Sequence, residues 1–320
     1  MAPPAAEQGA VRHTQSARLG TYNLDRSKTM VAGISAGAYM ATQLQVAYSR
    51  TFHGAAIFAG GPYFCAQDNV TIALDDCTNN YYPTNVPLLE QDTNNTAFYG
   101  YIDPTSYLSG QKAYLFSGTN DHTVYQSIVK DLNSYLTHYG VAVTTNFTTN
   151  AGHGWVTPDV TQACTATTSP FLNNCGFDAE QTFLSLLYGT LNARRSGSLT
   201  GSLLAYDQNE FFGGNAGAYS MDATGYVFVP SACASGSTCK LLVALHGCAQ
   251  GYSVVGNAFT TKAGINEWAD TNNIIVLYPQ AIETSYNPNG CFDWWGYLST
   301  NYAAKAGPQM SAIYNMVQRL

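Results

Sequence analysis

A single G-x-S-x-G pattern, Gly33-Ile-Ser35-Ala-Gly37, offers a nucleophile. The apolar stretch Thr29–Ala32 precedes it, and the small residues that follow begin a helical pattern. A sharp turn from strand to helix strains the serine backbone and lifts its hydroxyl clear of the sheet, and small neighbours let the helix approach the strand. This context predicts that Ser35 attacks a carbonyl carbon. The alternative is a serine that only caps a helix.

The hydroxyl of a serine is a poor nucleophile until a base takes its proton. Among six histidines, His153 is the best candidate for this base, because the glycines of Asn150-Ala-Gly-His-Gly-Trp155 free the backbone to aim the ring. His122 is the alternative, although it directly follows an aspartate and a productive bond to that neighbour is difficult. The base in turn needs a carboxylate that holds its tautomer and stabilises the imidazolium.

Asp121 is the candidate for this carboxylate. It lies just past the apolar strand Ala113–Phe116, at the end where open α/β sheets place their ligands. Asp103 and Asp159 are the alternatives, and no clear strand precedes either of them. The order serine, aspartate, histidine along the chain is that of α/β-hydrolases and differs from the trypsin-like and subtilisin-like orders.

The negative charge that develops on the attacked oxygen needs backbone N–H donors. Ala36, directly after the serine, offers the first donor. A second is expected from the loop His246-Gly-Cys248, which follows the apolar strand Leu241–Leu245. His246 itself is also compatible with a buried histidine whose hydrogen bonds are satisfied. This loop lies far beyond the serine in the sequence, whereas an ordinary hydrolase places it before the serine.

The elements that must position these residues alternate between strands and helices. Apolar, β-branched stretches predict buried parallel strands at Thr29–Gly33, Ala55–Ala59, Ala113–Phe116, Val141–Asn146, Gly225–Val229, Leu241–Leu245 and Ile274–Tyr278. Helical patterns lie between them at Ala36–Ser49, Val124–His138, Asp178–Leu191, Asn257–Thr271 and Pro308–Arg319. This alternation predicts one mostly parallel, doubly wound α/β sheet.

The late position of the oxyanion loop is explained if the chain is circularly permuted. Rejoining the termini places the strands at 225–229, 241–245 and 274–278 before the strand that leads to the serine. That restores the usual order of hydrolase elements. Because domain termini often lie close together on the surface, such a cut is physically tolerable.

The 320 residues are 46% hydrophobic but only 10% charged, with 13 Lys+Arg against 20 Asp+Glu. This balance argues against a nucleic-acid partner, because counterion release needs clustered cations. No stretch approaches the roughly 18 apolar residues of a membrane span. Without repeats or long linkers, we expect one monomeric catalytic domain over 1–320 and no separate substrate-binding domain. Residues 1–20 are expected to be poorly structured, and 60–110 to be a long insertion beside the active site.

Eight cysteines and three sequons indicate the compartment. Close cysteine pairs on polar segments favour disulfides over free core thiols, although eight cysteines leave the connectivity open. Zinc-ligand spacing is absent, so no metal is expected. The sequons begin at Asn69, Asn94 and Asn146 and predict glycosylation. Together these features predict an extracellular protein secreted from a eukaryote.

The densest aromatic cluster, from Asn289 to Tyr297, follows the strand Ile274–Tyr278. Aromatic rings near the catalytic end of a sheet can line a groove for an acyl or polyester chain. Trp294, Trp295 and Tyr297 are therefore candidate substrate contacts and a candidate surface for adsorption to a neutral solid. Trp155, near the candidate base, is a further candidate contact. The alternatives are packing in the core and, for the aspartate of the cluster, a role in orienting the loop.

At these motifs the sequence resembles the single-domain, circularly permuted, extracellular polyhydroxybutyrate depolymerases of filamentous fungi. The similarity runs from about Lys28 to Leu320 and includes VAGISAGAYMA, FAGGPYFC, SGTNDHTV, LHGCAQ and NPNGCFDWWGY. The resemblance implies an α/β-hydrolase fold, with Ser35, Asp121 and His153 as the triad and no cofactor. It also implies an oxyanion hole and a set of disulfides. The resemblance assigns the amides of Ala36 and Cys248 to the oxyanion hole. The implied disulfides are Cys65–Cys77, Cys164–Cys175, Cys233–Cys239 and Cys248–Cys291.

The resulting hypothesis is a secreted serine esterase that cleaves ester bonds of poly(3-hydroxybutyrate) or a related aliphatic polyester through an acyl-enzyme. The family pattern Trp-Asp-Trp-x-Gly-Trp is changed at Phe292 and Tyr297, so substrate preference stays open. One alternative is an extracellular esterase for feruloyl or acetyl groups on polysaccharide, or for short hydroxyalkanoate oligomers. The other is a noncatalytic binding protein on a hydrolase scaffold.

Overall fold

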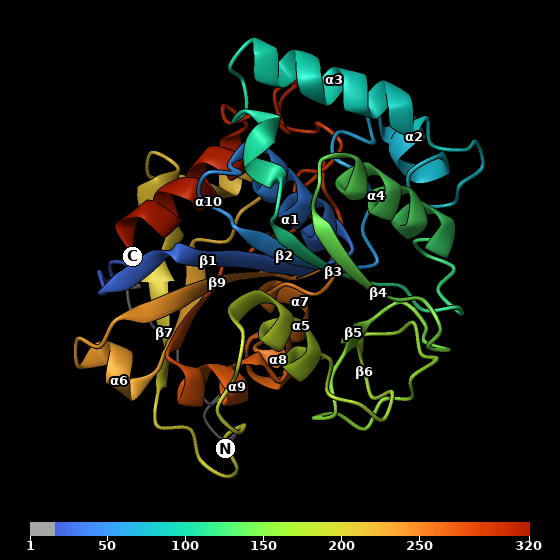
Figure 1. The fold of residues 1–320 in the computed structure, drawn as a ribbon. Helices are drawn as coiled ribbons and strands as arrows, with labels where there is room; N and C mark the ends of the chain where they lie inside the picture. Colours follow the sequence, from blue (N-terminus) through green and yellow to red (C-terminus); the bar gives the residue numbers. More distant parts are fainter. Residues whose placement is uncertain (1–16) are drawn as a thin grey trace, which may run out of the picture.

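A single large sheet dominates the computed structural model, which describes residues 17–320 (Figure 1). Its strands are β1 Leu24–Ile34, β2 Gly54–Phe58, β3 Lys112–Phe116, β4 Ala142–Asn146, β7 Ser202–Asp207, β8 Thr224–Val229, β9 Cys239–Leu245 and β10 Ile274–Tyr278. They lie in the order β4-β3-β2-β1-β9-β10-β8-β7. All pairs from β4 to β10 are parallel, whereas β8 pairs antiparallel with both β10 and β7. The mostly parallel α/β fold is therefore confirmed.

Helices cover both faces of this sheet. The main ones are α1 Ala36–Ala47, α3 Val86–Phe98, α4 Gln126–His138, α5 Ala179–Tyr188, α9 Ile265–Asn272 and α10 Pro308–Arg319. Shorter ones are α2 Val70–Asp75, α6 Ser231–Ala234, α7 Tyr252–Val255 and α8 Ala258–Lys262, and three single turns of 3-10 helix lie at Thr105–Leu108, Gln208–Phe211 and Ala216–Tyr219. Figure 1 shows α1, α4 and α10 on one side of the sheet and α5 and α9 on the other.

The two layers explain why the central strands are apolar along their whole length. Successive side chains of a strand point to opposite faces. Val31 of β1 therefore packs in the core beneath α1, α4 and α10, together with Leu44 and Ile313. Its neighbour Ala32 packs in the core beneath α5 and α9, together with Phe183.

The connectivity matches a circularly permuted hydrolase. If the strands are counted from β7, with β1 to β4 following β10, the sheet order reads 8-7-6-5-3-4-2-1. The Tyr22 N–H donates to the Leu320 carbonyl at 2.7 Å, so the two ends of the described chain lie side by side. Strand β1, which leads to Ser35, accordingly lies next to β9, whose end leads into the predicted oxyanion loop.

Several elements differ from the sequence predictions. Strand β8 was expected to be parallel but is antiparallel, and β7 at the edge of the sheet was not predicted. The helix expected at 257–271 is divided into α8 and α9 at Gly264, whose φ of 73° interrupts the helix. The expected insertion 60–110 contains α2 and α3.

The expected poorly structured segment 1–20 falls mostly outside the described residues, which exclude 1–16. Within it, Ala17 forms a β-bridge with Tyr206, and Leu19 is buried. Residues 17–20 are thus attached to the domain. Among the described residues, no helix is both long and apolar enough to cross a membrane.

Four disulfides join all eight cysteines, in the pattern that the resemblance implied. The pairs are Cys65–Cys77, Cys164–Cys175, Cys233–Cys239 and Cys248–Cys291. The first encloses α2. The last ties the loop after β9 to the aromatic cluster.

Candidate active site

Ser35 occupies the sharp turn between β1 and α1. Its φ of 55° and ψ of −124° lie in a region that non-glycine residues rarely adopt, which is the strained geometry of a nucleophile elbow. A Cβ at Gly33 would overlap the Gly37 carbonyl, and a Cβ at Gly37 would overlap the carbonyls of Leu245 and His246. Both glycines of the motif are therefore required for the close approach of α1 to the sheet.

His153 and Asp121 form a buried hydrogen-bonded pair. The His153 Nδ1 lies 2.8 Å from the Asp121 Oδ2, and both residues are at most 5% exposed. The other carboxylate oxygen accepts the N–H groups of Thr123 and Val124 at 2.9 and 3.0 Å. The carboxylate can thus hold the proton on Nδ1 and leave Nε2 as the basic nitrogen.

The loops that carry these two residues are joined directly. Thr119 N–H donates to the Thr149 carbonyl at 2.9 Å, and Asn120 N–H donates to the Ala151 carbonyl at 3.1 Å. A Cβ at Gly118 would overlap the same Ala151 carbonyl. The glycine after β3 therefore lets the aspartate loop approach the histidine loop.

The alternatives considered for the base and the carboxylate have other partners. His122 is exposed and packs edge-on against Tyr125. Asp103 forms ion pairs with Lys305 and Arg50, and Asp159 forms one with Arg194. None of these three residues lines the cavity described below.

The loop after β9 lies beside the serine. A Cβ at Gly247 would come 3.2 Å from the Ser35 Cβ, so only glycine leaves this space free. The Gly247 N–H donates to the Gln250 Oε1 at 2.8 Å. The Gln250 amide in turn donates to the carbonyls of Pro170 and Phe171 at 3.0 and 3.2 Å. The loop is thereby fixed to a second segment of the cavity wall.

His246 is a buried structural histidine. Its Nε2 accepts the Ala281 N–H at 3.0 Å, so Nδ1 carries the proton and donates to the Gly247 carbonyl at 2.7 Å. Burial lowers the pKa of His246 to about 4, which keeps the ring neutral. In a trans peptide the carbonyl and the following N–H point in opposite directions. The bond to the Gly247 carbonyl therefore also orients the N–H of Cys248.

The amides of Ala36 and Cys248 are the two available donors beside the serine. Ala36 is the first residue of α1, where helical N–H groups lack an intrahelical acceptor. Among the described residues, no acceptor contacts the Cys248 N–H, and Cys248 lines the cavity. The arrangement could therefore stabilise an oxyanion formed at Ser35.

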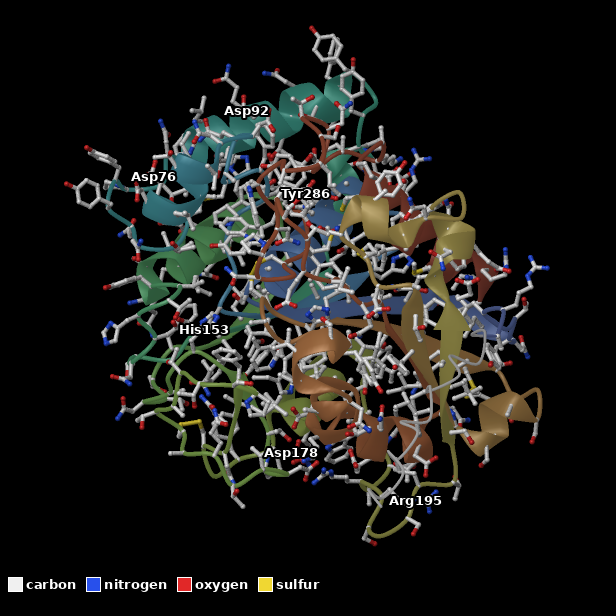
Figure 2. All side chains as sticks on the ribbon, turned by 180° about the vertical axis from the view of Figure 1, so that it is seen from behind. Asp76, Asp92, His153, Asp178, Arg195 and Tyr286 are labelled. Carbon is white, nitrogen blue, oxygen red and sulfur yellow. A yellow bond between two sulfur atoms is a disulfide. The ribbon has the colours of Figure 1, made fainter. Side chains whose placement is uncertain are left out.

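A cavity of about 620 Å³ contains Ser35 and His153 in its lining. Its walls come from segments far apart in the sequence, including Tyr286 and the α2 residues Val70 and Leu74. Figure 2 labels His153 and Tyr286, two of the lining residues, on separate segments of the chain. The insertion 60–110 thus contributes to the cavity through α2. Apart from His153, the described lining holds no ionisable side chain except tyrosine, so the cavity is electrically neutral and mostly apolar.

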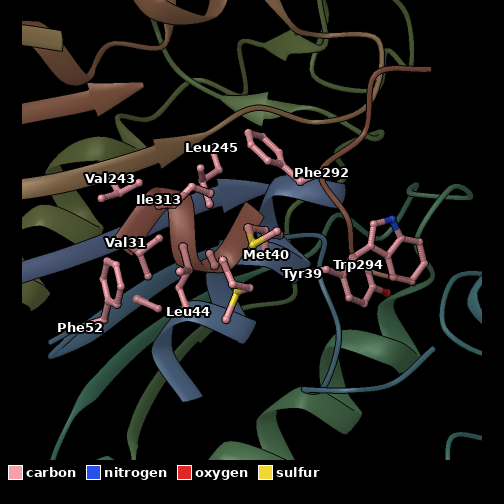
Figure 3. Close-up of a cluster of buried hydrophobic side chains, with 14 of the residues drawn as sticks. Val31, Tyr39, Met40, Leu44, Phe52, Val243, Leu245, Phe292, Trp294 and Ile313 are labelled. Atoms are coloured by element: carbon pink, nitrogen blue, oxygen red, sulfur yellow. The ribbon is translucent and has the colours of Figure 1, made fainter. Parts of the chain in front are cut away.

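Trp294 and Trp295 both line the cavity, as predicted for substrate contacts. The Trp294 ring stacks on Tyr39 of α1 with 4.1 Å between the centroids, and it meets Trp295 edge-on at 5.6 Å. Figure 3 shows Tyr39 and Trp294 side by side at one end of the hydrophobic core. The Tyr39 hydroxyl also donates to the Cys77 carbonyl, which links α1 to the disulfide around α2.

The structure does not place Trp155 or Tyr297 in the cavity lining. Trp155 is fully buried below it, where its indole N–H donates to Glu180 at 2.7 Å. The Tyr297 hydroxyl turns inward and donates to the Cys291 carbonyl at 2.8 Å. The structure therefore does not bring these two predicted substrate contacts into the cavity lining, because internal hydrogen bonds hold both side chains.

Sequence reasoning did not select several residues of the cavity wall: Tyr39, Val70, Leu74, Phe171, Gln250 and Tyr286. Tyr39 gave a signal that could have been used, since it is the first large side chain after the serine in a run of alanine and glycine. The rest lie on loops or on a short helix without any chemical motif.

The three sequons differ in accessibility. Asn69 and Asn94 are exposed, on α2's N-terminal cap and on α3. Asn146 is half-buried, and its Oδ1 accepts from the Thr148 N–H at 3.3 Å and the Thr149 hydroxyl at 3.0 Å. The first two amides are therefore the more accessible candidates for glycosylation.

The chain is similar to known proteins over most of its length. The sequence model of the prolyl oligopeptidase family matches residues 15–176. A polyhydroxybutyrate depolymerase of Talaromyces funiculosus is 39% identical over 321 residues, which cover 94% of this chain and 92% of that protein. A poly(3-hydroxybutyrate) depolymerase of Delftia acidovorans is 41% identical over 310 residues. That alignment covers 94% of this chain but only 61% of the Delftia protein.

Two solved structures share the fold. The crystal structure of PHB depolymerase from Penicillium funiculosum matches with a TM-score of 0.86 and 38% identity, over 95% of this chain and 98% of that one. A serine-to-alanine variant of a PHB depolymerase, complexed with an R3HB trimer, matches with the same values.

Proposed function

Because the chain belongs to the polyhydroxybutyrate depolymerases, and its residues 15–176 match the prolyl oligopeptidase family, we propose that it is a serine esterase that hydrolyses poly(3-hydroxybutyrate) or a related aliphatic polyester. The observation that carries the proposal is the His153–Asp121 pair, in which Nδ1 and Oδ2 are 2.8 Å apart. This pair lies beside the same neutral cavity that Ser35 lines. An ester chain without charges suits such a cavity, since a charged ligand would lose its hydration there without gaining a counterion.

In the proposed reaction, Ser35 Oγ attacks the ester carbonyl carbon while His153 Nε2 takes the hydroxyl proton. Asp121 accepts the Nδ1–H bond and stabilises the imidazolium that forms. The amides of Ala36 and Cys248 donate to the carbonyl oxygen as it becomes negative. The imidazolium then protonates the leaving alkoxide, which departs as an alcohol and leaves an acyl group on Ser35.

The second half of the cycle repeats these roles with water. His153 takes a proton from water, which attacks the acyl carbon, and the ester bond to Ser35 breaks as the histidine returns the proton to the serine oxygen. The products are a hydroxyl-ended and a carboxyl-ended fragment. Among the described residues Ser35 and His153 share no hydrogen bond, and catalytic bonds of this kind often tighten only when substrate is bound.

Secretion and glycosylation belong to the same proposal. Four disulfides suit an oxidising compartment. We expect glycans on Asn69 and Asn94, whose side chains are exposed, and a monomeric enzyme that needs no metal or cofactor. The solid or dissolved polyester is the expected partner.

Clearing of a turbid poly(3-hydroxybutyrate) suspension tests the proposal, with Ser35→Ala as the inactive form. Ser134→Ala, an exposed serine of α4, is the matched control. We expect the parent and the control to clear the suspension and Ser35→Ala to leave it turbid while its circular dichroism is unchanged. A parent enzyme that cleaves feruloyl or acetyl esters of polysaccharide but not the polymer would contradict the polyester substrate. If Ser35 also failed to react with a fluorophosphonate, the chain would instead be a binding protein.

A further inference from the structure

The aromatic wall of the cavity is a loop without a helix or strand of its own. The residues Cys291, Trp294 and Trp295 of the loop Cys291–Tyr297 line the cavity. No regular element spans 291–297, so the usual backbone hydrogen bonds of a helix or sheet do not fix this loop. Its buried N–H groups still need acceptors. Whatever supplies them determines where the two indoles lie.

Asp293 supplies these acceptors. Its side chain is almost completely buried, with 2% of the residue exposed. The Oδ1 accepts the N–H groups of Gly296 and Tyr297 at 2.8 and 3.1 Å, and the Oδ2 accepts that of Leu298 at 3.2 Å. One carboxylate thus closes the loop on itself around the two tryptophans.

The main chain of Asp293 is in turn held by two helices. Its N–H donates to the Gln309 Oε1 of α10 at 2.8 Å. Its carbonyl accepts from the Gln43 Nε2 of α1 at 3.2 Å. Because α1 directly follows Ser35, the bond from Gln43 fixes the position of the loop relative to Ser35.

We propose that Asp293 is a positioning residue, which fixes the loop Cys291–Tyr297 and thereby holds Trp294 and Trp295 against the bound substrate chain. This inference rests on the proposed function. Trp294 meets the stacked Tyr39 and Trp295 only if the loop keeps its conformation. The role requires two acceptor oxygens, so an amide at this position, with one acceptor and one donor group, cannot satisfy the same N–H groups.

The role is sensitive to pH in a defined direction. Burial raises the pKa of Asp293 to about 6. The closed loop therefore binds this proton more tightly than an open loop with a solvated carboxyl would, so lowering the pH through about 6 favours the closed loop. The groups that face Asp293 are few. The phenols of Tyr297 and Tyr302 stay neutral because burial raises the pKa of each, and the glutamines from α1 and α10 are uncharged.

Asp68 is the other carboxylate near this loop. A Cβ at Gly296 would overlap the Asp68 Oδ1, which places this residue directly against the loop. It is exposed, and among the described residues it donates or accepts no hydrogen bond with Asp293. Its effect on the loop therefore has to be separated from that of Asp293 by substitution.

The test compares two substrates in Asp293→Asn. The first is the (R)-3-hydroxybutyrate trimer, whose chain we expect to reach the wall formed by the two tryptophans. The second is p-nitrophenyl acetate, which is small relative to the 620 Å³ cavity. Both substrates use the same catalytic groups, so the ratio of their kcat/KM values cancels any effect of pH on the chemical step. We expect Asp293→Asn to lower this ratio about fivefold at pH 8, through KM of the trimer, as expected for the loss of about one hydrogen bond.

The pH profile of the ratio separates positioning from a general structural role. In the parent enzyme the ratio should hold or rise as the pH is lowered through about 6, and in Asp293→Asn it should be lower and flat. Asp68→Asn should keep the parent profile. Asp270→Asn should keep it too, since Asp270 is a matched buried carboxylate that accepts the N–H groups of Thr200 and Gly201, away from the cavity.

The inference is overturned if Asp293→Asn folds and keeps the parent ratio, or if Asp270→Asn lowers it equally. If Asp293→Asn does not fold, a parent ratio that falls as the pH is lowered through about 6, and that still falls in Asp68→Asn, overturns it. If the parent cleaves the acetate but not the trimer, the proposed function fails. The near-ultraviolet circular dichroism of the tryptophans then decides, because the parent must retain it as the pH falls through about 6 if Asp293 keeps the loop closed.

Discussion

Asp121 divides its two carboxylate oxygens between two tasks. The Oδ2 meets His153, while the Oδ1 accepts two backbone N–H groups of its own loop, those of Thr123 and Val124. The second task orients the carboxylate toward the histidine. In the proposed reaction the same geometry decides which nitrogen of His153 carries the proton.

We expect Asp121→Asn to lower kcat on p-nitrophenyl butyrate by roughly 10⁴-fold, the size of effect seen when a serine hydrolase holds the wrong histidine tautomer. The amide can still accept the backbone N–H groups with its oxygen, so thermal stability should change little. Asp159→Asn is the matched control, because this carboxylate pairs with Arg194 and does not line the cavity. Equal losses in the two variants would contradict the assignment of Asp121.

The polar residues of the site could be predicted from the sequence more reliably than the residues that form the cavity walls. Ser35, Asp121 and His153 were selected because strained turns and glycines leave a recognisable pattern around them. Trp155 was selected as an aromatic residue near the base, but the sequence alone does not show which way its side chain points. The Trp155 indole N–H donates to the buried Glu180, and the sequence around Trp155 does not indicate this hydrogen-bond partner.

At the scale of elements, α1 lies close against β9 because Gly37 faces the backbone at the end of that strand. The contact leaves no room for a side chain between the helix and the carbonyls of Leu245 and His246. The same contact places the oxyanion loop next to the serine, so the packing of two elements sets the geometry of the site.

Gly37→Ala should therefore reduce both stability and activity. Forcing a methyl group into this contact should lower the free energy of unfolding by about 1–3 kcal/mol, and the displaced loop should reduce kcat more than KM. Chemical denaturation and steady-state kinetics measure the two effects. Gly217→Ala is the control, since its added Cβ would meet only the Asn215 side chain at 3.6 Å. An unchanged kcat in Gly37→Ala would argue against the close packing described here.

Most central strands could be predicted because burial on both faces makes them continuous apolar runs. The same runs do not encode direction, which is why the antiparallel pairing of β8 was missed. Strand β7 is largely exposed and lacks such a run. Helix α3 has only three buried residues, Val86, Leu89 and Thr93, so its apolar stripe is too thin to recognise.

The charge-poor composition has a counterpart on the surface of the whole molecule. Several of the most exposed aromatic residues lie in the segment 60–110: Tyr81, Tyr82, Phe98, Tyr99 and Tyr101. By contrast Trp294 is 6% exposed, and Trp295 and Tyr297 are only partly exposed, so the loop that carries them presents little aromatic surface. Exposed aromatic groups with few charges around them suit adsorption to an uncharged solid.

We expect the triple variant Phe98→Ser, Tyr99→Ser and Tyr101→Ser to bind solid poly(3-hydroxybutyrate) at least about fivefold more weakly, because it removes exposed apolar area. Its kcat/KM on the soluble trimer should be unchanged, since none of the three lines the cavity. Leu204→Ser, an exposed apolar residue on the opposite edge of the sheet, is the control. Unchanged adsorption of the triple variant would show that another surface meets the polymer.

The central claim is that Ser35 carries the acyl group during polyester hydrolysis. Acid quenching of the enzyme during turnover of the (R)-3-hydroxybutyrate trimer, followed by peptide mass spectrometry, measures this directly. The account predicts a mass increase of one or more 3-hydroxybutyryl units on the peptide that contains Ser35, and none in Ser35→Ala. Hydrolysis of the trimer with the adduct on another residue, or undiminished hydrolysis by Ser35→Ala, would contradict it.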